Sequence, residues 1–97
     1  MAEALLIDDD ASFQAALAEL VRAEGFSVDT AASLGEARAF LGEHTPDLAL
    51  VDLKLPDGSG LELLREIDSS VPTEIVLITG HATVDSAVEA LRSGASD

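Results

Sequence analysis

Four short apolar runs alternate with four amphipathic stretches along the chain. Three of the runs are apolar at every position, as expected for strands that are covered on both faces of a parallel sheet. The run at 26–30 instead alternates apolar and polar residues, which predicts a strand at the edge of the sheet. We therefore predict strands at residues 4–7, 26–30, 48–51 and 75–78.

The amphipathic stretches have features typical of α-helices. The first and the fourth carry apolar residues at helical spacing, and a glycine follows each stripe as a stop signal. The second and the third begin with a Ser-x-x-Glu capping box, whose side chains bind free backbone N–H groups of the first turn. The first helix carries Phe13, Leu17, Leu20 and Val21; the second Ser33, Leu34, Glu36, Ala37 and Leu41; the third Ser59, Glu62, Leu63, Leu64 and Ile67; the fourth covers 84–91.

This order of elements predicts the fold class. A strand followed by a helix, repeated four times, gives right-handed parallel crossovers and an open sheet with helices on both faces. The length of 97 residues is that of one small domain. We therefore expect a single α/β domain with a doubly wound parallel sheet.

Charge and composition narrow the function. The chain has 19 acidic and 5 basic residues and a formal net charge of −14, which argues against direct binding to nucleic acid or anionic membranes. There is no cysteine for disulfides or thiolate zinc sites, and no apolar run is long enough to span a bilayer. The first residues carry no basic segment typical of a secretory signal, so we expect a cytoplasmic setting.

Acidic and hydroxyl side chains follow three of the predicted strands. Asp8, Asp9 and Asp10 follow the first strand, Asp52 follows the third, and Thr79 follows the fourth. Parallel strands bring these positions to one edge of the sheet, where ligands bind in open α/β folds. Carboxylates that converge there repel one another unless a cation joins them. Because the cluster offers only oxygen ligands, it favours Mg²⁺.

Each residue also has a simpler interpretation. The aspartate run is compatible with a solvated turn in which Asp10 caps the first helix, Asp52 with the start of a loop, and Thr79 with a hydroxyl bonded to nearby backbone. The coincidence of all three at one sheet edge favours a shared function. With Mg²⁺ present, Asp52 could act as a nucleophile toward phosphorus, and Thr79 could hold a transferred oxygen.

Three motifs in this order resemble the receiver domain of bacterial two-component response regulators. The resemblance covers essentially the whole chain, and the loop motifs are similar to those of receivers that precede sigma-54-activating ATPase domains. The motifs are Leu-Leu-Ile-Asp-Asp-Asp at 5–10, Asp-Leu-Lys-Leu-Pro-Asp-Gly-Ser-Gly-Leu-Glu-Leu-Leu at 52–64, and Ile-Thr-Gly-His-Ala at 78–82.

The resemblance implies a function and a role for each site residue. Asp52 would accept a phosphoryl group from a sensor histidine kinase and so switch an output domain, with transcriptional regulation the expected result. Asp9 would bind Mg²⁺ directly, Asp8 through water, and Lys54 through its backbone carbonyl. Thr79 would be the hydroxyl that follows the phosphoryl group. Such a module is a phosphoacceptor and not an enzyme.

The resemblance also implies a flavodoxin-like fold with strand order 2-1-3-4-5. The family's fifth strand, its fifth helix and a Lys-Pro pair at the end of that strand would lie beyond residue 97. We therefore expect a receiver domain over 1–97 with strand order 2-1-3-4 and without those elements. An apolar edge at 75–78 would then favour self-association through that strand or through the uncovered sheet face.

Two other functions remain as alternatives. A phosphatase of the haloacid-dehalogenase type also has an Asp-x-Asp motif after its first strand, as at Asp8 and Asp10. However, Ala11-Ser12 stands here where that family has Gly-Thr. The second alternative is a receiver-like scaffold that binds partners without being phosphorylated.

Overall fold

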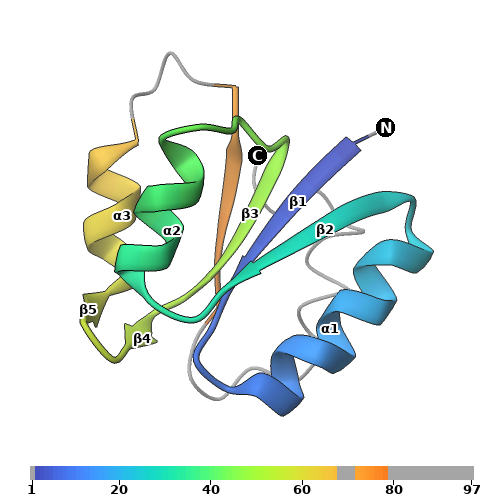
Figure 1. The fold of residues 1–97 in the computed structure, drawn as a ribbon, viewed down its shortest axis with the longest axis horizontal. Coiled ribbons are helices and arrows are strands. Elements are labelled where there is room, and N and C mark those ends of the chain that lie inside the picture. The colour runs from blue at the N-terminus through green and yellow to red at the C-terminus, as the bar shows by residue number, and fades with distance from the viewer. Residues whose placement is uncertain (1, 68–71, 79–97) are drawn as a thin grey trace.

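The sheet is parallel and has the predicted strand order. In the computed structural model, residues 2–67 and 72–78 are described, and their four long strands are arranged in the order β2-β1-β3-β6 (Figure 1). The predicted fold class is confirmed, and the alternating run does form an edge strand. The helix expected at 84–91 lies outside the described residues. The strands are β1 (Ala2–Ile7), β2 (Phe26–Ala31), β3 (Leu48–Asp52) and β6 (Glu74–Ile78).

The pairing register brings the carboxyl ends of the strands together. At that edge of the sheet, Ile7 pairs with Ala31 on one side and with Val51 on the other. Asp52 is the next residue of β3 and pairs with Ile78. The residues that follow β1 therefore emerge beside the last residue of β3.

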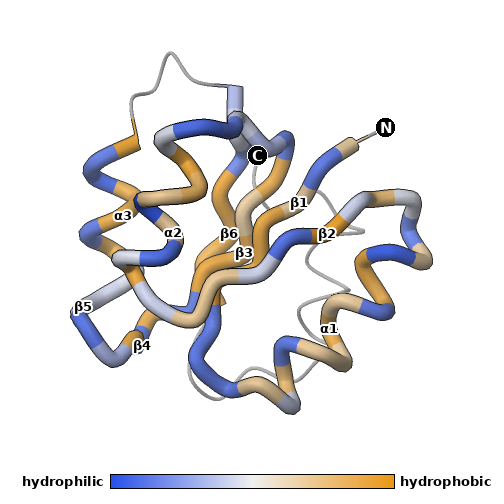
Figure 2. Tube along the Cα trace, viewed as in Figure 1, coloured by the Kyte–Doolittle hydropathy of each residue, from blue (hydrophilic) through white to orange (hydrophobic). Residues whose placement is uncertain are grey.

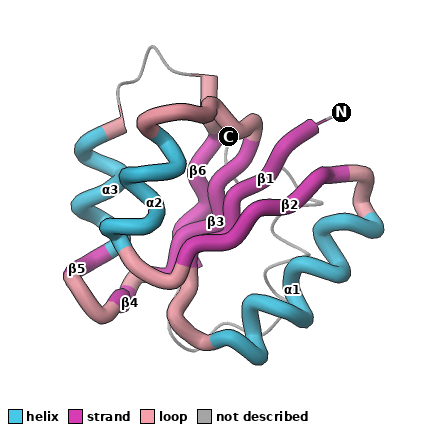
Figure 3. The backbone as a smooth tube through the Cα atoms, viewed as in Figure 1, coloured by secondary structure: helices cyan, strands magenta, loops and turns pink. Residues whose placement is uncertain are grey.

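Helices cover both faces of the sheet (Figures 1 and 3). Side chains that alternate along the strands form two cores, so apolar residues concentrate in the central strands (Figure 2). On one face Leu6 and Leu50 pack with Leu17 and Val21, and on the other Leu5 and its neighbours pack with the remaining helices. No helix in the described part of the chain is long and apolar enough to cross a membrane. The helices are α1 (Ala11–Ala23), α2 (Leu34–Leu41) and α3 (Gly60–Glu66).

The helix caps agree with the predictions in most respects. Asp10 caps α1 by accepting a hydrogen bond from the N–H of Phe13 at 3.0 Å. The capping box at the start of α3 is complete. At α2, Ser33 caps the helix, but the carboxylate of Glu36 accepts from the N–H of Ala32 and not from that of Ser33. The predicted capping box of α2 is therefore only half formed.

One predicted core residue is on the surface. Leu63 of α3 is buried, whereas Leu64 is 40% exposed. Successive residues of a helix point about 100° apart, and α3 is rotated so that Leu63 faces the core and Leu64 lies beside it.

A small antiparallel hairpin between β3 and α3 was not predicted. It pairs β4 (Lys54–Leu55) with β5 (Gly58–Ser59). Gly58 has a φ of 149°, and a Cβ there would lie 2.5 Å from a carboxylate oxygen of Glu62 and 2.7 Å from a methyl group of Leu34. Only glycine fits this turn, because its backbone lies directly against the start of α2.

Candidate metal-binding site

Three carboxylates meet at the carboxyl edge of the sheet. Asp8 and Asp9 follow β1, Asp52 ends β3, and one oxygen from each side chain lies within 4.8 Å of the others. Two ligands on opposite sides of one Mg²⁺ are about 4.2 Å apart, because each Mg–O distance is about 2.1 Å. The cluster is therefore close to the size of the ligand shell of a single ion.

Asp52 is the most enclosed of the three carboxylates. It is 9% exposed and ends a strand whose residues are all buried. One of its oxygens accepts a long hydrogen bond, 3.4 Å, from the N–H of Lys54. Behind it, a Cβ on Gly60 would lie only 2.4 Å from the backbone oxygen of Asp52, so α3 begins in direct contact with this strand end.

The cluster is electrostatically unfavourable for its own members. Burial raises the pKa of Asp8 above its usual value, and the negative charges of Asp52, Asp9 and Asp10 add to this effect. A hydrogen bond from the N–H of Asp10, 2.9 Å from Asp8 Oδ1, opposes it. Within residues 2–67 and 72–78, no ion pair involves any of these carboxylates. A cation bound between them would remove the repulsion.

The chemistry of the donor set fits a hard divalent cation. The three ligating residues offer only oxygen atoms, two of them are partly or fully accessible, and Asp52 is held rigidly by strand pairing. Mg²⁺ prefers such oxygen ligands, keeps several waters, and needs only one or two carboxylates from the protein. Asp8, Asp9 and Asp52 are thus the residues that could hold it.

A glutamine that was not predicted as part of the site supports the end of β1. The side-chain amide of Gln14 lies within hydrogen-bond distance of the carbonyl oxygens of Leu6, Asp8 and Ala31, at 3.2, 3.2 and 3.0 Å. It thereby joins α1 to the carboxyl ends of β1 and β2. The available signal was its position: Gln14 lies three residues before Leu17 on the buried stripe of α1, where a polar residue needs a partner.

A second unpredicted contact holds the β4–β5 hairpin. The carboxylate of Asp57 accepts hydrogen bonds from the N–H groups of Leu34 and Gly35, at 2.8 and 2.9 Å. These two bonds lower the pKa of Asp57. In the sequence, Pro-Asp-Gly indicates only a turn, and nothing in it identifies the start of α2 as the partner.

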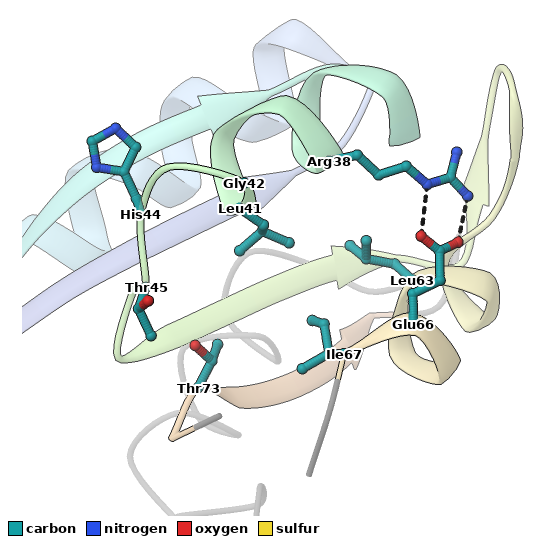
Figure 4. Close-up of a pocket in the computed structure, with 9 residues that line it drawn as sticks. All are labelled: Arg38, Leu41, Gly42, His44, Thr45, Leu63, Glu66, Ile67 and Thr73. Atoms are coloured by element: carbon teal, nitrogen blue, oxygen red, sulfur yellow. Dashed lines mark hydrogen bonds and ion pairs between the residues drawn. The ribbon is translucent and has the colours of Figure 1, made fainter. Parts of the chain in front are cut away.

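A separate cavity lies at the opposite edge of the sheet (Figure 4). It has a volume of about 470 Å³ and lies among the ends of α2 and α3 and the starts of β3 and β6. Three of its polar side chains have hydrogen-bond partners within the protein. Arg38 forms two hydrogen bonds with Glu66, at 2.8 and 2.5 Å, and the Thr73 hydroxyl donates to the carbonyl of Pro46. This cavity contains none of the predicted site residues.

The structure brings together three of the five predicted site residues. Asp8, Asp9 and Asp52 converge as expected from the parallel sheet. Lys54 directly follows this edge in β4, and the metal-binding role of its carbonyl stays a prediction. Thr79 lies outside the described residues.

The family model of the response regulator receiver domain matches residues 4–97. The chain belongs to this family. The three motifs and the acidic cluster all lie within the residues that the family model matches.

Two curated relatives illustrate the sequence similarity of this receiver domain. The photosynthetic apparatus regulatory protein RegA of Cereibacter sphaeroides is 38% identical over 96% of the chain, which corresponds to 51% of that protein. The alginate biosynthesis transcriptional regulatory protein AlgB of Pseudomonas aeruginosa is 36% identical over 96% of the chain and 21% of its own length. The chain thus spans between a fifth and a half of these relatives.

Solved structures show the same fold. A CheY-like receiver domain from Methanospirillum hungatei is 33% identical, with a TM-score of 0.77 over 97% of this chain and 76% of that one. A response regulator from Burkholderia pseudomallei is 30% identical, with a TM-score of 0.76 over 97% of this chain and 56% of that one. The latter structure contains a phosphorylated aspartic acid, a calcium ion and citrate.

Proposed function

We propose that residues 1–97 form one receiver domain in which Asp52 accepts a phosphoryl group from a sensor histidine kinase, with Mg²⁺ as cofactor. The observation that carries this proposal is the convergence of Asp8, Asp9 and Asp52 at the carboxyl edge of the sheet. The phosphorylated aspartic acid and the calcium ion in the related Burkholderia structure support it. Asp9 binds the metal directly, Asp8 through water, and Lys54 through its carbonyl oxygen.

The chemistry follows from the position of Asp52 at the end of β3. One carboxylate oxygen attacks the phosphorus, a new O–P bond forms, and the bond from phosphorus to the kinase histidine nitrogen breaks with its electron pair left on nitrogen. A carboxylate needs no general base for this attack. A bound divalent cation neutralises the charge of the incoming phosphoryl group, which three carboxylates would otherwise repel.

The proposed response starts at Thr79. This residue directly follows Ile78, which pairs with Asp52 and whose carbonyl accepts a hydrogen bond from the N–H of Leu53 at 3.0 Å. A hydroxyl on the residue that directly follows the partner of Asp52 in the sequence is suited to follow a phosphoryl group on Asp52. Its movement shifts a two-state equilibrium that an output domain reads, and we propose that the parent protein regulates transcription in the cytoplasm.

The decisive experiment is phosphorylation by a small donor. Incubation with acetyl phosphate and Mg²⁺ should give a hydroxylamine-labile phosphoryl adduct, detected by mass spectrometry. The adduct should be absent from Asp52→Asn and present in Asp47→Asn, which changes another aspartate at the opposite edge of the sheet. An adduct that persists in Asp52→Asn would refute the assignment.

We further propose that the domain is a phosphoacceptor and not a phosphatase. After Asp10, Ala11 and Ser12 stand in place of the Gly-Thr of haloacid-dehalogenase enzymes. Incubation with p-nitrophenyl phosphate and Mg²⁺ should therefore release no more nitrophenol than Asp52→Asn does. Sustained turnover that depends on Asp8 would favour the phosphatase instead.

We also propose that the domain self-associates through β6. Among the described residues, β6 pairs only with β3, and its Leu77 is 37% exposed. An apolar strand that is outermost in the described sheet can act as a template for pairing with another chain. Light scattering at micromolar concentration should show a species larger than one chain, and a strictly monomeric species would contradict this proposal.

A further inference from the structure

We infer that Asp57 is a positioning residue that fixes the metal-binding loop by attaching the β4–β5 hairpin to the first turn of α2. This inference deepens the proposed function, because the loop carries Lys54 and directly follows Asp52. Asp57 touches neither the metal nor the phosphoryl group in this scheme. It acts through the backbone between the hairpin and the end of β3.

The contact is more than an ordinary helix cap. The first N–H groups of a helix have no partner within the helix, and a single capping side chain usually satisfies one of them. Ser33 already does so at α2, where its hydroxyl accepts from the N–H of Glu36 at 3.2 Å. Asp57 approaches from 22 and 23 residues away and uses one oxygen for each of the N–H groups of Gly35 and Leu34. Since α2 is already capped, the main consequence of the added contact is to hold the hairpin.

The fit of the hairpin against α2 leaves little room for another arrangement. A Cβ on Gly58, the next residue, would collide with a methyl group of Leu34 at 2.7 Å. Leu55, on the other side of the turn, is buried in the core that also contains Leu34. The negative charge of Asp57 also faces the positive end of the helix dipole. The packing of the hairpin and the charge of Asp57 therefore both favour the observed placement of the hairpin against α2.

A short series of backbone bonds joins the hairpin to the acidic cluster. Leu55 pairs with Gly58, and Lys54 pairs with Ser59. The N–H of Lys54 donates to Asp52 Oδ1. The N–H of Gly60 donates to the carbonyl of Leu53 at 2.9 Å, which closes the loop at its base. Fixing the tip of the hairpin at Asp57 thus restricts the backbone of Lys54, whose carbonyl is the proposed metal ligand.

The test compares Asp57→Ala with a control that removes an equivalent contact elsewhere. Asp47 is also exposed and also accepts a hydrogen bond from a distant backbone N–H, that of Glu3 at 2.8 Å, but at the opposite edge of the sheet. Asp57→Ala and Asp47→Ala each remove one negative charge and a carboxylate-to-backbone contact. Because the effect of a lost charge on Mg²⁺ binding depends on its distance from the ion, Asp57→Asn is the matched control: it removes the same charge at the same place but keeps one acceptor oxygen.

Mg²⁺ titrations followed by NMR should give a clear order of affinities. We expect Asp57→Ala to bind Mg²⁺ about tenfold more weakly than the unaltered chain, the lower end of the effect of losing support for metal ligands. Asp57→Asn keeps one acceptor oxygen and should recover part of this loss. Asp47→Ala should bind like the unaltered chain. Asp57→Ala affinity equal to that of Asp47→Ala would overturn the inference.

A spectroscopic measurement without metal separates this inference from the proposed function. In Asp57→Ala the amide resonances of Leu34 and Gly35 should shift because their acceptor is gone, and the carbonyl resonance of Lys54 should shift with them. If only Leu34 and Gly35 respond, Asp57 is a helix cap and the inference fails while the proposed function stands. If the unaltered chain binds no Mg²⁺, the proposed function fails, and the Lys54 resonance still decides whether Asp57 positions the loop.

Discussion

The carboxyl edge of the sheet and the surface formed by helices α2 and α3 handle charge in opposite ways. At the carboxyl edge, Asp8, Asp9 and Asp52 are brought together by strand pairing, and their like charges lie within 4.8 Å of one another. On that helical surface, Arg38 and Glu66 are more than two-fifths exposed and form an ion pair between α2 and α3. Rigid strands can hold charges in an unfavourable arrangement, whereas exposed side chains on helices adopt a favourable one. The unfavourable arrangement is the one suited to binding a cation.

The largest expected effect on stability and Mg²⁺ binding comes from replacing a glycine at the carboxyl edge, with a second glycine replacement as the control. Gly60→Ala places a Cβ 2.4 Å from the backbone oxygen of Asp52, so either α3 or the end of β3 must move. We expect a loss of about 2 kcal/mol in the free energy of unfolding, measured by urea denaturation, together with weaker Mg²⁺ binding. Gly42→Ala, near the opposite edge, places its Cβ 3.4 Å from the nearest backbone oxygen and in helical geometry. It should leave stability and Mg²⁺ binding nearly unchanged, and equal losses in both variants would contradict the proposed rigidity of the carboxyl edge.

The next effect concerns the pH dependence of stability without metal. Because the pKa of Asp8 is raised in the folded state, the fold loses stability as pH rises from the usual value of 3.8 through the folded pKa. Asp8→Asn removes this loss, so at neutral pH in EDTA the variant should be more stable than the unaltered chain. Below pH 3.8 the two should converge. Saturating Mg²⁺ should reverse the order, because the ion stabilises the folded form of the unaltered chain.

Glu66→Gln is the control for Asp8→Asn, because its expected effect on stability at neutral pH has the opposite sign. The pKa of Glu66 is lowered by its hydrogen bonds to Arg38, so its contribution to stability is present above the usual value of 4.5 and disappears as pH falls through the folded pKa. This variant should therefore be slightly less stable than the unaltered chain at neutral pH. A stabilising effect at neutral pH would show that the α2–α3 surface and the carboxyl edge do not differ as described.

The smallest effect is expected for Arg38→Gln. The guanidinium group and its partner are exposed, and exposed ion pairs contribute little because water and salt screen them. Thermal unfolding at low and high salt should show almost no difference between this variant and the unaltered chain, and Mg²⁺ affinity should not change. A large loss of stability would mean that the packing of α2 against α3 depends on this pair.

Much of the fold and part of the candidate site could be predicted from the sequence. The strand at 48–51 was evident because every residue is apolar, and β3 is buried throughout. The edge position of 26–30 followed from its alternation, and β2 is at the edge. The convergence of Asp8 with Asp52 followed from one rule, that parallel strands end at a common edge. Features that depend on pattern or on sheet geometry were therefore predictable.

Features that depend on a single tertiary contact could not be predicted from the sequence. Gln14 and Asp57 both bind backbone groups of segments far away in the sequence, and no local pattern identifies such partners. The exposure of Leu64 depends on how α3 is rotated against the sheet, which the spacing of apolar residues in so short a helix does not determine. The role of Thr79 remains a prediction, because that residue lies outside the described part of the chain.

The amide of Gln14 has a consequence for how the domain opens. A side-chain NH₂ group has two hydrogens, yet three carbonyl oxygens lie within its reach: one in the inner strand β1, one just after it at Asp8, and one in the outer strand β2. An outer strand ordinarily frays from either tip, but here one tip is fastened to the neighbouring helix. Separation of β2 should thus begin near Phe26 and proceed toward Ala31, so that protection against deuterium exchange rises steadily along the strand.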